Sequence, residues 1–133
     1  MPPFGQLMHY TQLLFLFLAE DDEPETWTQT VSAQNLALMS SADIKRQEHI
    51  YEFILTESNH CQVLKVIQKI FVEGMFRYLS LSKDIVNRIF PQIDALIELH
   101  FRFLEELRAR QNQNPVVETI ADILHNQFSA ENR

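Results

Sequence analysis

Hydrophobic residues between Ser41 and Phe71 recur at the spacing of an α-helix. Pro and Gly are absent from this stretch until Gly74, and Ser41 is suited to cap a helix whose first turn contains Asp43. The pattern predicts one helix of roughly 30 residues. At about 100° per residue, its buried stripe contains Ile50, Ile54, Glu57, Cys61, Leu64, Gln68 and Phe71, widened by Phe53, His60 and Ile67.

Two glutamates of this helix face different sides. Glu57 lies in the middle of the apolar stripe, where a carboxylate loses hydration, so we expect it to pair with a cationic or hydroxyl group from another helix and to have a structural role. Glu52 lies about 130–140° around the helix from Glu57. The pattern alone makes Glu52 a solvated surface charge.

A second helical segment is predicted from Ser82 to Gln111, with a kink or break near Phe90 because Pro91 cannot donate a backbone hydrogen bond. His100 lies within its apolar face and is expected to be a hydrogen-bonded core residue, since no partner at metal-site spacing accompanies it. The expected face contains Ile93, Leu96, Ile97, His100, Phe103, Leu104 and Leu107. The arginines Arg108 and Arg110 suit the end of this helix, where cations are favourable.

Two further elements flank these helices. Asn114 followed by Pro115 predicts the start of a third helix, in which Val116, Val117, Ile120, Ile123, Leu124 and Phe128 recur at helical spacing. Upstream, residues 27–41 predict a weak, short helical or irregular arm packed through Val31, Leu36 and either Leu38 or Met39.

Composition limits the class of protein. The chain of 133 residues suits one domain, 46% of its residues are hydrophobic, and its two glycines favour an all-α fold. The net charge of −7 argues against nucleic acid as the partner. The single cysteine, Cys61, fits a reducing compartment and a cytoplasmic location, and it offers no disulfide and no metal cluster. Motifs for phosphate loops, zinc hydrolases and nucleophile elbows are absent, so no cofactor, metal or catalytic residue is expected, and the remaining function is to bind another protein.

The N-terminal run LLFLFLA, Leu13–Ala19, is too short to cross a bilayer, which takes about 20 residues. As a signal peptide it lacks a basic start and a small-residue cleavage site, although a secreted helical factor remains a third interpretation. The acidic EDDEPE that follows, Glu20–Glu25, predicts a linker.

The stretch IKRQEHIYEFILTESNHCQVLKVIQKIF, Ile44–Phe71, resembles the first signature helix of the Dbl homology (DH) domain of Rho guanine-nucleotide exchange factors. IFPQIDALIELHFRFLEELRARQ, Ile89–Gln111, and VVETIADILHNQFSAEN, Val116–Asn132, are similar to the next regions of that domain. ETWTQTV is similar to the arm that precedes the domain in the Rho-directed, Lbc and RGS-containing subgroup. The resemblance implies an elongated helical bundle, with residues 1–26 as N-terminal segment and linker, 27–41 as the arm and 42–133 as the N-terminal part of a DH domain.

The resemblance also implies a function and a partner. It places Glu52 where the family's glutamate contacts the switch I loop of a nucleotide-free Rho-family GTPase and promotes GDP release. Glu48 and Thr56 would border this contact, and Trp27 would be an aromatic anchor on the GTPase, or would close over the arm's own apolar residues. The protein would regulate a GTPase rather than be an enzyme itself.

The chain is shorter than a whole DH domain of about 200 residues and lacks the later signature helix and the pleckstrin homology domain. The expectation is therefore an incomplete domain with little exchange activity of its own, recruited to membrane or cytoskeleton by domains outside the chain. Its uncovered helical faces favour self-association. The alternative is a non-catalytic helical adaptor that binds GTPases or other partners without exchange.

Overall fold

The computed structural model describes residues 23–129, which are mostly helical and contain no strand. The elements in order are η1 (Trp27–Thr30), α2 (Ala33–Ala37), α3 (Ser41–Val66), η2 (Ile67–Val72), α4 (Glu73–Tyr78), α5 (Lys83–Ile89), α6 (Ile93–Gln113) and α7 (Ala121–Phe128). The described residues form two compact units that share α3 and α6. One contains Asn59–Leu99, and the other contains Glu23–Ser58 with the described part of His100–Arg133.

The long first helix is confirmed, with different ends. Ser40, and not Ser41, is its N-cap, because the Ser40 hydroxyl accepts a hydrogen bond from the backbone N–H of Asp43 at 3.1 Å. The helical path also continues beyond α3, through the π-helix η2 and then α4 to Tyr78. Gly74 lies inside α4 and does not end it, since one glycine costs a helix only about 1 kcal/mol.

The predicted apolar stripe of this helix is buried only in part. Ile54, Cys61 and Leu64 are buried, but Phe53 and Phe71 are 39% and 51% exposed, and His60 is exposed as well. Phe71 lies in η2, whose wider π-helical turn departs from the α-helical spacing that placed it on the stripe. The prediction of a wholly buried face is therefore wrong.

The second predicted segment is broken where Pro91 requires it. Helix α5 ends at Ile89 and α6 begins at Ile93, and between them Gln92 takes a left-handed backbone conformation with φ of 57°. The expected face of α6 is confirmed for Ile97, Phe103 and Leu107, which are buried. Leu96 is 44% exposed, so that prediction is wrong.

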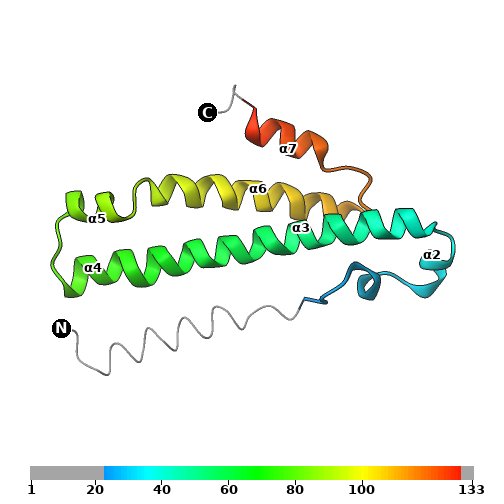
Figure 1. Cartoon of the computed structure of the whole chain (residues 1–133), viewed down its shortest axis with the longest axis horizontal. Coiled ribbons are helices and arrows are strands. Elements are labelled where there is room, and N and C mark those ends of the chain that lie inside the picture. Colours follow the sequence, from blue (N-terminus) through cyan, green and yellow to red (C-terminus); the bar gives the residue numbers. More distant parts are fainter. Residues whose placement is uncertain (1–22, 130–133) are drawn as a thin grey trace. The chain divides into compact units, whose positions relative to one another are not determined.

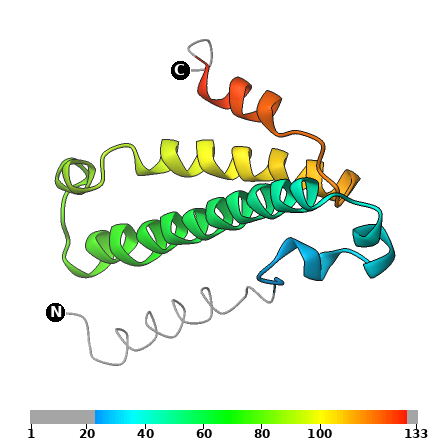
Figure 2. The same cartoon turned by 45° about the vertical axis from the view of Figure 1, so that its right-hand side comes forward.

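In the unit that contains the chain's first described residues, α3 and α6 lie side by side (Figures 1 and 2). Their core is formed by Ile54, Phe103, Leu107 and Ile123, with Ile50, Leu104, Ile120 and Leu124 packed around it. Phe103 makes edge-to-face contacts with Phe53 and Phe128, with ring centroids 6.1 and 5.5 Å apart. This core joins α3 to α6 and α7, which come much later in the sequence.

The third helix starts later than predicted. Asn114 and Pro115 do not open it, and α7 begins only at Ala121. The Asn114 side chain accepts a hydrogen bond from the backbone N–H of Val116, two residues on, at 2.9 Å, which closes a local turn instead of a helix cap. Residues 114–120 are thus a non-helical connector between α6 and α7, and we refer to them as the connector.

Two further predictions concern the ends of the chain. The apolar run Leu13–Ala19 and the first half of the acidic linker lie outside the described residues. In the arm, Leu38 is 87% exposed and does not pack, whereas Met39, Val31 and Leu36 are half-buried. None of the helices within residues 23–129 is both long and apolar enough to pass through a bilayer.

Candidate functional site

Glu52 lies on the exposed side of α3, as its position on the helical wheel predicts. Within the described part of the chain, its carboxylate forms no hydrogen bond or ion pair. Lys45, His49 and Thr56 are exposed on the same side of the helix at successive turns, and we call these four residues the Glu52 face. The Thr56 hydroxyl donates to the backbone carbonyl of Glu52 at 2.8 Å, and its oxygen can still accept a hydrogen bond from outside.

Glu48, one turn before Glu52, has a different environment. Its two carboxylate oxygens accept hydrogen bonds from the backbone N–H groups of Trp27 and Thr28, at 2.8 and 2.9 Å. Partial burial alone would raise the pKa of Glu48, but these hydrogen bonds, together with one from the Thr28 side chain, bring the pKa below its usual value. The carboxylate therefore caps the short helix η1, where Thr26 makes no side-chain cap.

Trp27 is 3% exposed, and its indole N–H donates to the carbonyl oxygen of Pro115 at 2.8 Å. An indole that is buried needs such an acceptor, and the connector supplies it. Of the four residues expected to meet a GTPase, the structure thus brings Glu52 and Thr56 to one exposed face. The polar groups of Glu48 and Trp27 instead form hydrogen bonds within the chain.

Glu57 and His100, each predicted to have a structural role, form a polar pair. His100 Nδ1 lies 2.6 Å from Glu57 Oε1, and the side chains are 19% and 12% exposed. Glu57 comes from α3 and His100 from α6, so the partner expected for Glu57 from another helix is present. Sequence spacing did not indicate which residue it would be.

The residues just before the arm are attached to α3 and α6 by further contacts that the sequence did not reveal. The Tyr51 hydroxyl donates to the carbonyl of Pro24 at 2.6 Å, and Arg108 Nη2 lies 2.5 Å from Glu23 Oε1. Beside the arm is an open cavity of about 250 Å³, lined by Glu23, Pro24, Trp27, Thr30, Tyr51, Arg108, Gln111 and Pro115. On sequence grounds, a favourable place at the end of a helix explains Arg108. The structure adds a specific partner, Glu23.

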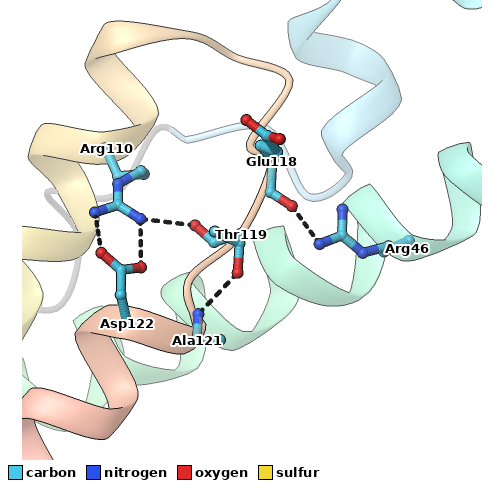
Figure 3. Close-up of polar contacts among 6 residues, drawn as sticks. All are labelled: Arg46, Arg110, Glu118, Thr119, Ala121 and Asp122. Carbon is cyan, nitrogen blue, oxygen red and sulfur yellow. Dashed lines mark hydrogen bonds and ion pairs between the residues drawn. The ribbon is translucent and has the colours of Figure 1, made fainter.

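The connector is fixed by side chains from both long helices. Gln47 is 3% exposed, donates to the carbonyl of Val117 at 2.7 Å and accepts from its N–H at 2.9 Å. These bonds occupy both backbone groups of Val117, including the carbonyl that would accept from the N–H of Ala121 in a helix begun at Pro115. Arg46 donates to the carbonyl of Glu118 (Figure 3).

Arg110 completes the attachment from α6. It donates to the carbonyl of Thr119 at 2.9 Å and binds both carboxylate oxygens of Asp122 at 2.6 Å (Figure 3). The Arg110 hydrogen bonds hold the pKa of Asp122 well below its usual range, at about 2. The Thr119 hydroxyl accepts from the backbone N–H of Ala121, the first residue of α7. The start of α7 is thus set by α6 and the connector together.

No set of three or more His, Cys, Asp or Glu residues between residues 23 and 129 is placed to hold a metal ion. Cys61 is buried within its unit, where a thiol is a packing group. What the described surface offers is an exposed acidic position on a well-packed helix, which suits recognition of another protein. The fold and this face thus define an all-helical protein-interaction domain.

The chain belongs to the RhoGEF domain family, whose pattern it matches over residues 49–132. It is 32% identical over 138 residues to rat Rho guanine nucleotide exchange factor 2, covering 96% of this chain and 14% of that protein. It is 36% identical over 121 residues to human Rho guanine nucleotide exchange factor 28, covering 86% of this chain and 7% of that protein. The chain therefore spans only a small part of these relatives.

Solved structures give the same family. The chain superimposes on the DH/PH fragment of PDZRHOGEF in complex with human RhoA with a TM-score of 0.76 at 29% identity, covering 81% of this chain and 30% of that one. The DH/PH domains of p115-RhoGEF give a TM-score of 0.77 at 31% identity, with 84% and 30% covered. The resemblance of the sequence to a DH domain and the all-α fold are confirmed. Glu52 falls inside the matched region, whereas the arm and Glu48 precede it.

Proposed function

We propose that this chain supplies part of the GTPase-binding surface of a guanine-nucleotide exchange factor for Rho-family GTPases, with Glu52 as its principal contact. The observation that carries the proposal is the exposed Glu52 carboxylate, without a partner in the described residues, on a helix that belongs to the RhoGEF family. Complexes with human RhoA among the similar structures support the choice of partner. The charge of the chain, −7, gives no support to nucleic acid as an alternative.

The chemistry follows from the state of this carboxylate. Because the Glu52 carboxylate has no hydrogen bond to break among residues 23–129, it can accept charge-assisted hydrogen bonds from the switch I loop of a GTPase at little cost. Such bonds would hold the loop away from the nucleotide and its Mg²⁺. Exchange is then a population shift, in which the factor binds the nucleotide-free GTPase more tightly than the nucleotide-bound form.

The neighbouring residues have distinct proposed roles. Thr56 borders the contact and offers a hydroxyl oxygen as acceptor. Glu48 and Trp27 act indirectly by holding the arm beside this part of α3, because their polar groups are engaged within the chain. Glu57 and His100 keep α3 and α6 in register and do not contact the partner.

Release of fluorescent GDP from RhoA, and binding to nucleotide-free RhoA, test the proposal. The loss of charge-assisted hydrogen bonds costs about 1.5–3 kcal/mol, so Glu52→Ala should reduce binding roughly 10- to 100-fold without lowering the melting temperature. Glu105→Ala, which removes an exposed carboxylate from α6, is the matched control and should change neither. Equal binding by wild type and Glu52→Ala would refute the role of Glu52.

Exchange and binding are separable in this assay. The chain spans 30% of the DH/PH chain that was solved with RhoA, so we expect weaker exchange by these 133 residues than by a longer exchange factor that contains them. The second candidate is an adaptor that binds a GTPase without exchange. Binding to nucleotide-free RhoA with no acceleration of release, in the short and the longer protein alike, would support the adaptor.

A further inference from the structure

The segment Glu23–Thr30, called the arm from here on because it overlaps the start of the predicted arm, is held by groups that other elements supply. Glu48 and Tyr51 come from α3, Arg108 from α6, and the Pro115 carbonyl from the connector. We call these four residues the arm site. Tyr51 is buried, and the helices that carry it and Arg108 are packed by the Ile54, Phe103, Leu107 and Ile123 core. The core that packs these two helices therefore contains no residue of the arm.

The arm itself has little structure of its own. It contains a four-residue 3-10 turn whose only buried residue is Trp27. A turn of this length is not stable in isolation, and its first N–H groups are capped by Glu48 from α3 instead of by an arm residue. The arm thus behaves, in its contacts, as a short peptide bound to a helical surface.

Each arm-site residue recognises a different chemical feature. Arg108 binds a carboxylate, the Tyr51 hydroxyl a backbone carbonyl, and the Pro115 carbonyl an indole N–H. Glu48 binds two successive backbone N–H groups, at and after the tryptophan. The adjoining open cavity of about 250 Å³ is lined by residues of the arm as well as of the arm site.

From this geometry we propose that the arm site is a binding site for an acidic–aromatic linear segment, with glutamate four residues before tryptophan, which the chain's own arm occupies in cis. The occupant is separable, so a peptide of the same chemistry binds when the arm is removed. This proposal does not require GTPase binding.

The test uses the full chain with Glu23→Ala and Trp27→Ala, which removes the arm's two anchoring side chains and leaves the arm site intact. We call this double variant the emptied chain. Because Trp27 is the chain's single tryptophan, the emission of a synthetic peptide EPETWTQT then comes from the peptide alone. We expect a saturable blue shift as its indole becomes buried. In titration calorimetry, which Trp27 does not disturb, the wild-type chain should bind the peptide at least tenfold more weakly, because a tethered segment competes at millimolar effective concentration.

Two matched changes test recognition. A peptide with lysine in place of its first glutamate should bind at least tenfold more weakly, because lysine faces Arg108. Glu48→Gln in the emptied chain should have a similar effect, because glutamine has one acceptor oxygen for two N–H donors. Two results would overturn the proposal. One is that the emptied chain keeps its helical signal but gives no saturable shift at millimolar peptide. The other is that the emptied and wild-type chains bind the peptide equally.

A second variant covers the case in which the emptied chain loses its helical structure. Glu48→Gln in the otherwise native chain should shift the Trp27 emission to the red while the far-UV circular dichroism stays unchanged. Loss of helical signal together with the shift would show that the arm is an inseparable part of the fold, and the proposal would be wrong.

Discussion

The Gln47→Leu substitution gives the strongest test of how the connector is held. Gln47 and Val117 are 3% and 4% exposed, and the Gln47 amide satisfies both the N–H and the carbonyl of Val117, at 2.9 and 2.7 Å. Leucine has a similar size but no polar group, so both backbone groups lose this partner. A buried polar group without a partner costs about 1–3 kcal/mol. Arg46 is 3.5 Å from the Val117 carbonyl and compensates in part, so we expect a loss of about 2–4 kcal/mol.

Urea denaturation followed by circular dichroism measures this loss, and hydrogen exchange of the Val117 amide locates it. Gln113→Leu, at an exposed position of α6, is the control and should change stability by less than about 0.5 kcal/mol. The Val117 amide should exchange faster than in the wild-type chain in the Gln47→Leu variant but not in the Gln113→Leu variant. If the two substitutions have equal effects and the Val117 amide stays protected, the Gln47 amide does not hold the connector.

Three further outcomes are expected. Glu57→Ala removes the carboxylate that lies 2.6 Å from the half-buried His100 Nδ1 and should lower the melting temperature, as measured by circular dichroism; an unchanged value would show that the pair contributes no stability. Asp122 has its pKa lowered from 3.8 to about 2, so its stabilising effect is complete above pH 4 and is lost as pH falls toward 2. Asp122→Asn should therefore flatten the melting temperature over that range, and a parallel pH profile would contradict this. Phe103→Ala, which empties a core position that is 1% exposed, should cost about 3–5 kcal/mol in urea denaturation, against less than about 0.5 for Leu38→Ala at 87% exposure; similar costs would contradict the assigned core.

The candidate site was predicted where it depends on one helix. The wheel of α3 separates Glu52 from Glu57, and the structure agrees, because relative positions on a regular helix follow from the sequence spacing alone. The helical wheel could not predict that the Glu48 carboxylate accepts hydrogen bonds from the arm, since the donors, the backbone N–H groups of Thr28 and Trp27, lie 20 and 21 residues upstream. The burial of Trp27 depends in the same way on Pro115, 88 residues away.

The late start of α7 has the same origin. Asn114 and Pro115 carry a valid local signal for a helix start, yet Gln47 of α3 takes both backbone groups of Val117. In a helix begun at Pro115 the Val117 carbonyl would accept from the N–H of Ala121, so its hydrogen bond to Gln47 competes with that helix bond. By contrast, the break at Pro91 was predictable, because proline lacks the donor in every context.

By itself, the sequence determined the all-helical class, the long helix through Glu52, the break at Pro91 and the family resemblance, because each depends on residue type and spacing within one segment. Only the tertiary structure decided which polar groups are occupied: His100 by Glu57, the arm by Glu48 and the connector by Gln47. These contacts join segments distant in sequence, and their partners are selected by the packing of α3, α6 and α7 rather than by any local pattern.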